Sequence, residues 1–326
     1  MTIDLETPWV EKYRPNEFEE IVSQNIAINN LKKFVKKKFD MPHMIFAGPA
    51  GTGKTSCALI IAKKLLKGEK YYRNVMELNA SDTVRMEFVR EKLKYFVSQN
   101  MILTENELKI VILDEADNIP KTVQQTLRRI IESAPNNVKF ILMCNYINEI
   151  IDPIISRCAV FRFVNLPKEK VIERLKLILT QEKITIPKAK EKEFFDVLFF
   201  ISAGDLRKAI NTLQMAVALE LLEDLDIDEL LKILGFVEEP ILDQLKQSIN
   251  EKNFKTAREL LYSIDFLDSR NFIRQLTKTL PDLKNLGNNK YSKLIKYFGE
   301  VDFRISQGAD EKIQLTSLLA ELINSR

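Results

Sequence analysis

A glycine-rich loop that ends in lysine and threonine is the first part of the sequence able to perform chemistry. It spans residues 48–55 and reads Gly48-Pro49-Ala50-Gly51-Thr52-Gly53-Lys54-Thr55. Glycines let such a loop curl around a phosphate group with its backbone N–H groups pointing inward. Lys54 would reach the β- and γ-phosphates, and the Thr55 hydroxyl would ligate Mg²⁺. The spacing therefore predicts a P-loop that binds a nucleoside triphosphate, with Ser56 in the same site.

Two adjacent carboxylates follow an apolar run at residues 110–113. Asp114 and Glu115 would leave the end of a buried strand in different directions, because successive side chains of a strand alternate. Asp114 suits the Mg²⁺ shell, whereas Glu115 suits the polarisation of the water that attacks the γ-phosphorus. Asp117 is interpreted as an ordinary acid of the following loop.

A neutral amide, Asn145, ends another apolar run and would orient the attacking water or the γ-phosphate; an Asn in a turn is the alternative. The sequence contains no Asn-Lys-x-Asp guanine signature. ATP is therefore favoured over GTP as the nucleotide.

Apolar runs that alternate with amphipathic segments must position these side chains. The runs lie at 44–47, 75–78, 110–113, 140–143 and 160–163, and helical spacing occupies 54–67, 83–98 and 121–133. Continuous apolar strands separated by helices indicate a parallel sheet that is covered on both faces. After Pro167 the strand signal disappears and the segments are helical. We predict an α/β domain over 1–165, a small helical domain over 166–236 and a terminal helical domain over 237–326.

Composition restricts the class of protein. The 326 residues are 45% hydrophobic and 29% charged, with 9 Gly and 11 Pro, which excludes a collagen-like or disordered chain. No apolar run reaches the ~20 residues of a membrane helix, so we expect an intracellular protein without a membrane partner. Three separated cysteines fit neither a disulfide framework nor a Cys-x-x-Cys metal site. The net charge of +3 does not by itself indicate a nucleic-acid-binding protein.

These motifs, together with four further segments, resemble the small subunits of replication factor C, the AAA+ sliding-clamp loader of archaea and eukaryotes. The four segments are residues 8–15, 77–82, 156–158 and 204–208. The resemblance covers the first two predicted domains strongly and the terminal helical domain more weakly. It implies an AAA+ ATPase domain, a helical lid over the nucleotide and a helical collar through which subunits assemble.

The resemblance also implies roles for individual residues around the nucleotide. The box at residues 8–15 implies Val10, Tyr13, Arg14 and Pro15 beside the adenine, and Val22 is expected in the same site. Asn79 resembles the switch residue that restrains Glu115 until DNA arrives.

Two arginines match family positions that act on the phosphates. Arg157, in the Ser-Arg-Cys segment, matches the arginine finger that serves a neighbouring subunit's ATP, and Arg207 matches the second sensor on the lid. Phosphoryl transfer spreads negative charge over the γ-oxygens, and one well-placed guanidinium contributes about 10³–10⁵ in rate. We expect Arg207 to reach the nucleotide only if the lid folds over it.

DNA contacts are expected on two helices that face the channel of a five-subunit ring. Arg90 matches a DNA-contacting position of the family, and Lys121 is a candidate for a phosphate contact. The family usually has Asp-Arg-Gly-Ile after residue 82, whereas this chain has Thr83-Val84-Arg85-Met86. The basic residue is displaced by one position, a rotation of ~100° on a helix, and Arg85 is the candidate for a phosphate contact there.

The expected function is that of an ATPase subunit of a hetero-oligomeric clamp loader. With other replication factor C subunits it would open a sliding clamp and load it onto primer–template DNA, using ATP and Mg²⁺. The alternatives are a non-hydrolysing structural subunit of the same complex and a different AAA+ DNA motor. The compartment would be the nucleus in a eukaryote and the cytoplasm in an archaeon.

Overall fold

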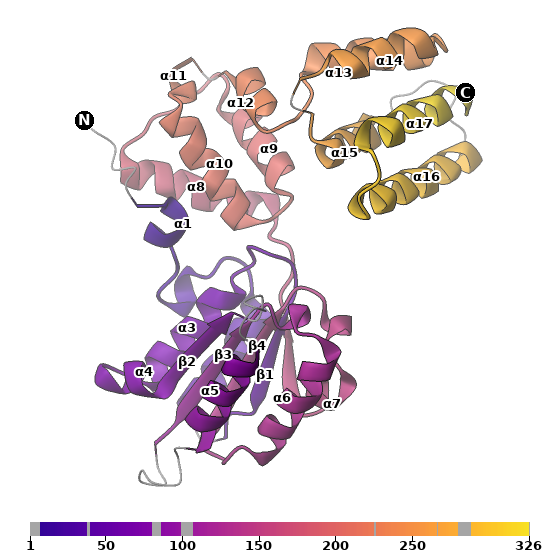
Figure 1. Ribbon diagram of the computed structural model, residues 1–326. Helices are drawn as coiled ribbons and strands as arrows, with labels where there is room; N and C mark the ends of the chain where they lie inside the picture. The colour runs from indigo at the N-terminus through magenta and orange to yellow at the C-terminus, as the bar shows by residue number, and fades with distance from the viewer. Residues whose placement is uncertain are drawn as a thin grey trace. The chain divides into compact units, whose positions relative to one another are not determined.

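A computed structural model describes residues 7–37, 40–79, 86–98, 107–224, 226–265, 267–279 and 288–325 (Figure 1). Within these ranges, the side chains of 86–90, 223–224, 279 and 288–289 are not described. The chain divides into two compact units, residues 1–218 and 219–326. The three-part division at 165 and 236 remains a prediction. None of the described helices is both long and apolar enough to cross a membrane.

A five-stranded sheet forms the centre of the first unit, with the strand order β2-β3-β4-β1-β5 and parallel pairing throughout. The strands are β1 (His43–Ala47), β2 (Val75–Asn79), β3 (Lys109–Asp114), β4 (Val138–Cys144) and β5 (Cys158–Arg162). Each lies over one of the predicted apolar runs. The predicted parallel sheet is therefore confirmed.

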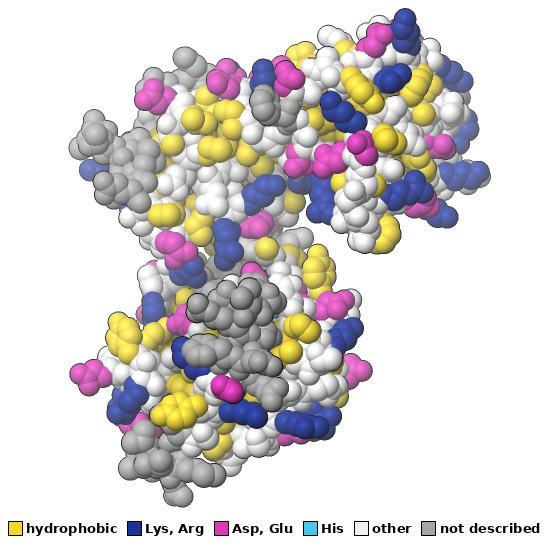
Figure 2. Space-filling model, viewed as in Figure 1, with side chains coloured by type: hydrophobic (Ala, Val, Ile, Leu, Met, Phe, Trp, Pro, Cys, Tyr) yellow, Lys and Arg dark blue, Asp and Glu magenta, His cyan; other side chains and the backbone are white. Residues whose placement is uncertain are grey.

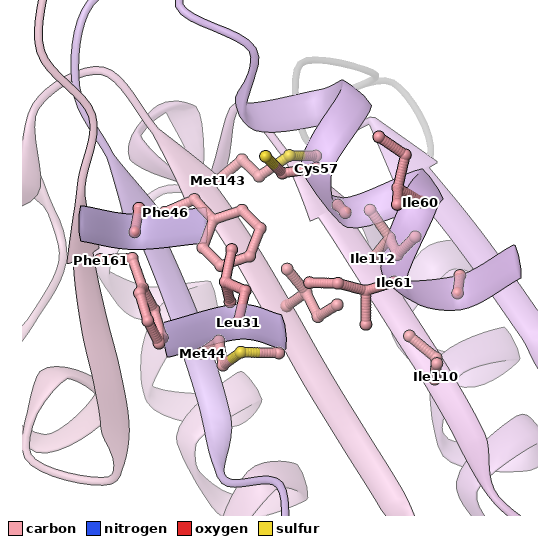
Figure 3. Close-up of a cluster of buried hydrophobic side chains, with 14 of the residues drawn as sticks. Leu31, Met44, Phe46, Cys57, Ile60, Ile61, Ile110, Ile112, Met143 and Phe161 are labelled. Carbon is pink, nitrogen blue, oxygen red and sulfur yellow. The ribbon is translucent and has the colours of Figure 1, made fainter. Parts of the chain in front are cut away.

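The side chains of these strands alternate between two cores, one on each face of the sheet. On β1, Met44 and Phe46 join one core, while Ile45 and Ala47 join the other. Helices α2 (Asn25–Lys36) and α3 (Lys54–Leu65) cover the first face, and Figure 3 shows Leu31 and Ile61 against this core. Helices α5 (Met86–Ser98) and α6 (Lys121–Ser133) cover the second. Burial on both faces explains why the strands are apolar throughout.

Short helices fill several connections of this unit. They are α1 (Trp9–Lys12), η1 (Phe18–Glu20), α4 (Glu69–Asn74), η4 (Ala116–Asn118), η5 (Ile147–Glu149) and α7 (Asp152–Ile155). After the last strand, α8 (Lys168–Glu182), α9 (Glu191–Ser202) and α10 (Leu206–Ala218) pack together, and α1 packs on α10. The first helix of the chain is thus attached to the helical part of the unit.

The second unit is entirely helical over the residues that the structure describes. It contains α11 (Leu221–Asp224), α12 (Ile227–Ile233), α13 (Glu239–Asn250), α14 (Phe254–Ser263), α15 (Ser269–Thr279), α16 (Asn288–Ser306) and α17 (Glu311–Asn324). Its core gathers apolar residues such as Leu245, Phe272 and Leu318. Side chains of Asp226, Asn253 and Asp310 cap helix N-termini by accepting backbone hydrogen bonds. The predicted all-α character of the C-terminal region is confirmed.

Candidate nucleotide site

The glycine-rich loop joins β1 to α3 and has no room for side chains at two of its glycines. A Cβ atom on Gly48 would lie 2.1 Å from the carbonyl oxygen of Phe163, and one on Gly51 would lie 1.7 Å from Asp205 Oδ1. The Thr52 hydroxyl donates to the Pro49 carbonyl over 2.8 Å, which closes the loop on itself. The loop ends at the N-terminus of α3, where unpaired N–H groups and the helix dipole favour an anion.

Lys54 is the first residue of α3 and is only 8% exposed. Its Nζ donates to the carbonyls of Gly48 over 2.6 Å and Pro49 over 2.8 Å, and to Asn145 Oδ1 over 3.0 Å. Burial lowers the pKa of Lys54, and the negative charge of Asp114 opposes that shift. The ammonium group is therefore held at the mouth of the loop beside Asn145, in a place where it would meet phosphate oxygens.

Hard oxygen ligands lie next to this lysine. The Thr55 hydroxyl donates to Asp114 Oδ2 over 3.0 Å, and Asp114 Oδ1 accepts from the Glu115 backbone N–H over 2.9 Å. A hydroxyl and a carboxylate at this spacing match the ligands that Mg²⁺ takes beside substrate phosphates, so the residues present fit the expected ion.

Glu115 follows β3 and lines the pocket beside Asp114. Its φ is 53°, in the left-handed region that few residues other than glycine adopt. Its Oε2 accepts from Asn118 Nδ2 over 3.1 Å. This hydrogen bond holds the Glu115 carboxylate in one direction.

The N-terminal segment forms a second wall of the pocket. Trp9 is fully buried, and its backbone N–H donates to Gln214 Oε1 over 2.8 Å. Arg174 Nη2 donates to the Tyr13 carbonyl over 2.8 Å, and the Tyr13 hydroxyl donates to Glu182. Burial and the Glu182 carboxylate raise the pKa of Tyr13. These contacts attach the segment to α8 and α10.

The third wall comes from the start of α10. The backbone N–H of Leu206 donates to the Gly51 carbonyl over 3.3 Å, and Asp205 Oδ1 accepts from the Lys208 N–H over 3.1 Å, which caps α10. Arg207 lines the same pocket, and its positive charge contributes to lowering the pKa values of both Glu11 and Lys54. The first turn of α10 thus lies directly over the glycine-rich loop.

One pocket collects nearly all of the residues predicted to bind nucleotide or metal. Its lining contains Val10, Tyr13, Arg14, Pro15, Val22, Ala50, Gly51, Thr52, Gly53, Lys54, Thr55, Ser56, Asp114, Glu115, Asn145 and Arg207. Gly48 and Pro49 lie outside the lining and contribute the carbonyls that accept from Lys54. The individual roles of these residues remain predictions.

Sequence reasoning missed five residues of the lining: Ile21, Leu166, Arg174, Leu206 and Ile210. The helical spacing from Arg207 could have indicated Ile210, because residues three apart lie on one side of a helix. No motif near Arg174 indicates a nucleotide site, since this residue reaches the pocket only because α8 packs beside it.

Other predicted residues lie away from the pocket. Asn79 ends β2 and is paired in register with Asp114, which places it one strand from the acidic pair. Arg157 Nη1 donates to the Pro153 carbonyl over 2.7 Å, and its Nη2 lies 2.5 Å from Glu132 Oε1. Lys121 begins α6, with its Nζ 3.8 Å from Glu149 Oε2. Arg90 belongs to α5, but its side chain and all of Arg85 lie outside the described residues.

Two family descriptions match the chain. Residues 44–166 match the ATPase family associated with various cellular activities (AAA), and residues 237–321 match the replication factor C C-terminal domain. A solved structure of the Thermotoga maritima RuvB Holliday junction branch migration motor has a TM-score of 0.53 and 18% identity, covering 73% of this chain and 79% of that chain. At this identity the likeness shows the fold alone.

Two archaeal proteins match this chain over almost their whole length. The replication factor C small subunit of Staphylothermus marinus is 41% identical over 319 residues, covering 96% of this chain and 94% of that protein. That of Aeropyrum pernix is 40% identical over 327 residues, covering 99% and 97% respectively. With such identity across both chains, and with the AAA and C-terminal domains in the expected order, the chain belongs to the replication factor C small subunit family.

Proposed function

We propose that this chain is an ATP-hydrolysing subunit of a clamp loader, which binds ATP with Mg²⁺ and helps to open a sliding clamp and load it onto primer–template DNA. The observation that carries the proposal is the convergence of four groups in one pocket. The ends of β3 and β4 supply Asp114, Glu115 and Asn145, and the loop after β1 supplies Lys54. ATP hydrolysis follows from the AAA family of the chain; the clamp and the DNA are inferred from its membership in the replication factor C family.

The chemistry assigns a separate task to each group. Lys54 would contact the β- and γ-phosphates, and its hydrogen bond to Asn145 would keep both groups on the same side of the γ-phosphate. Mg²⁺ held by Thr55 and Asp114 would neutralise charge on the phosphate oxygens. Glu115 would accept hydrogen bonds from the attacking water and orient it. Arg207 would add a positive charge from α10, so that nucleotide binding favours the closed position of that helix.

Arg157 would complete the site of a neighbouring subunit. Its guanidinium lies outside the pocket of its own chain and is partly exposed, at 39% of its side-chain surface. A guanidinium at a subunit surface is available to an adjoining triphosphate, and the large rate effect of such an arginine would make hydrolysis depend on assembly. We therefore propose a ring in which each active site is shared by two chains.

Contacts with DNA would be made by the ring rather than by a basic surface on one chain. Among the candidates for a DNA phosphate contact, Lys121 has a side chain that the structure describes. It lies at the start of α6 and is 70% exposed. On the face shown in Figure 2, basic and acidic side chains lie interspersed over the first unit. Weak positive potential on each chain would suffice when several chains surround one duplex, because phosphate contacts add together.

The test is ATP hydrolysis by the assembled complex, with and without primer–template DNA and clamp. We expect both to stimulate phosphate release, and we expect Glu115→Gln to abolish release while retaining ATP binding. Glu69→Gln, an isosteric change of an exposed carboxylate outside the pocket, serves as the matched control. If Glu115→Gln left phosphate release unchanged, the chain would be a structural subunit rather than an ATPase.

A further inference from the structure

Asp117 makes contacts that its position in the acidic motif does not explain. It lies in the one-turn helix η4, three residues beyond Asp114, and does not line the pocket. Its Oδ2 accepts from two successive backbone N–H groups, those of Asn145 over 2.9 Å and Tyr146 over 3.1 Å. One carboxylate oxygen therefore joins the segment after β3 to the segment after β4.

These two N–H groups belong to residues that have just left the sheet. Strand β4 ends at Cys144, whose Cα is paired in register with Ala47 of β1, so residues 145 and 146 have no strand partner in the ladder. Both residues are exposed, with Tyr146 at 67%, so packing constrains their side chains little. The bonds from Asp117 thus fix the backbone at the point where Asn145 leaves β4.

The direction of the Asn145 side chain follows from this backbone. Its Oδ1 accepts from Lys54 Nζ over 3.0 Å, and that distance is kept only while the backbone at residue 145 holds its place. A displacement of about 1 Å at a catalytic group can cost on the order of a hundredfold in rate. A residue that fixes the backbone of Asn145 can therefore change the rate of ATP hydrolysis without contacting ATP.

We infer that Asp117 is a positioning residue for ATP hydrolysis, which holds Asn145 through two backbone hydrogen bonds at the exit of β4. The inference rests on the proposed function, because it requires that Asn145 acts on the phosphates or on the attacking water. The three acids of the motif would then have different roles. Asp114 would bind the metal, Glu115 would orient the water, and Asp117 would hold the backbone at the end of β4.

The carboxylate oxygens of Asp117 have unequal surroundings. Oδ1 is buried and accepts no hydrogen bond from the described residues, whereas Oδ2 accepts two. An asparagine could keep its amide oxygen at the position of Oδ2, so Asp117→Asn preserves both backbone bonds and removes the charge. Asp117→Ala removes the bonds as well. The two variants therefore separate hydrogen bonding from charge.

The experiment measures kcat and KM for ATP in the assembled, DNA-stimulated complex. We expect Asp117→Ala to lower kcat about tenfold or more, with KM changed less than about threefold, and Asp117→Asn to restore most of kcat. The Asn145→Ala variant is expected to match Asp117→Ala, and the double variant to be no slower than Asn145→Ala alone, since both act through one group. Glu69→Ala is the control for loss of a carboxylate.

The outcomes separate this inference from the proposed function. The positioning role would be overturned if the falls in kcat of Asp117→Ala and Asn145→Ala multiplied in the double variant. It would also be overturned if Asp117→Asn were as slow as Asp117→Ala. Normal hydrolysis by Asp117→Ala when Asn145→Ala is slow would also overturn it. Normal hydrolysis by both Asn145→Ala and Glu115→Gln would instead refute the proposed function. If Asp117→Ala fails to fold, as thermal melting would show, Asp117→Ser takes its place, because its shorter side chain withdraws the acceptor from the two N–H groups.

Discussion

Arg157 Nη2 lies 2.5 Å from Glu132 Oε1, and the same oxygen accepts from Arg128 Nε over 2.8 Å. The bond to Arg128 is the main reason that the pKa of Glu132 is lowered, so this carboxylate stays charged between the two guanidinium groups. Glu132 thereby connects the C-terminal end of α6 to the segment that follows α7. Because Arg157 is anchored here and lies outside the pocket lining of its own chain, we propose that it serves the triphosphate of another chain.

Mixing two inactive variants tests this trans arrangement. Lys54→Ala subunits keep Arg157 but lose phosphate binding, whereas Arg157→Ala subunits bind ATP but lose the guanidinium. Each alone is expected to hydrolyse ATP about 10³-fold more slowly than the unchanged chain. Mixtures should regain part of the rate, measured as phosphate release, at interfaces that pair an intact Lys54 with an intact Arg157.

The control mixes a Lys54→Ala, Arg157→Ala double variant with Arg157→Ala subunits. This mixture contains no intact Arg157 and should stay inactive. Absence of recovery at every ratio would contradict the arrangement.

Substitution of Gly51 should displace α10 from the glycine-rich loop. The new Cβ would lie 1.7 Å from Asp205 Oδ1 and 3.0 Å from the backbone nitrogen of Leu206. We expect Gly51→Ala to weaken ATP binding by at least about tenfold, because Arg207 moves with that helix. Gly68→Ala is the control for a positive φ without a clash: its φ is +58°, its ψ is −135°, and nothing lies within 4 Å of its Cβ. Both variants should lose unfolding free energy, because an L side chain is strained at a positive φ. Equal ATP affinity in the two variants would show that the clash is harmless.

The buried position of Lys54 predicts how ATP affinity depends on pH. Burial lowers the pKa of this ammonium from its usual value of 10.5, so it loses its proton at lower pH than an exposed lysine. The charged form binds phosphate, and affinity should therefore fall as the pH rises through the lowered pKa, by up to about tenfold per pH unit. Two neighbours do not titrate in that range: burial raises the pKa of Cys144 to about 11, and the pKa of Tyr13 is raised.

Equilibrium titration with a fluorescent ATP analogue between neutral pH and about pH 9.5 measures this dependence. Lys54→Arg keeps its charge over the whole range and should give a flatter profile. A wild-type profile as flat as that of Lys54→Arg would show that Lys54 remains protonated and that burial does not control binding.

The sheet and the phosphate loop were predictable because their signals are local. Met44 to Ala47 and Ile110 to Leu113 are apolar without interruption, since both faces of a parallel strand are buried. The pairing of Thr55 with Asp114 follows from two strand ends that reach the same edge of the sheet. Arg174 and Glu182 carry no such signal: they are polar residues on an ordinary amphipathic helix, and their contacts with Tyr13 form through the docking of the N-terminal segment. At Asp117 the sequence favours an ordinary loop acid, since the two N–H groups that bind its carboxylate lie 28 and 29 residues further along the chain.

Glu182 attaches the N-terminal segment to α8. This carboxylate is 8% exposed at its side chain, accepts from the Tyr13 hydroxyl and lies 2.7 Å from Lys12 Nζ. Glu182→Ala removes the partner of the partly buried Tyr13 hydroxyl, at a cost of about 0.5–1.5 kcal/mol. Residues 10 and 13–15 line the pocket, so their detachment should weaken ATP binding.

The chain has a single tryptophan, Trp9, which is fully buried in this segment, so its fluorescence reports on attachment directly. Glu182→Ala should shift its emission toward longer wavelengths as the indole enters water, and saturating ATP should reverse part of the shift by binding to the attached form. Glu182→Gln keeps an acceptor for Tyr13 and should shift the emission less. Glu193→Ala, which removes an exposed carboxylate of α9, is the control and should leave the spectrum unchanged. An unchanged spectrum in Glu182→Ala would show that α1 stays docked on α10 through the Trp9 contacts alone.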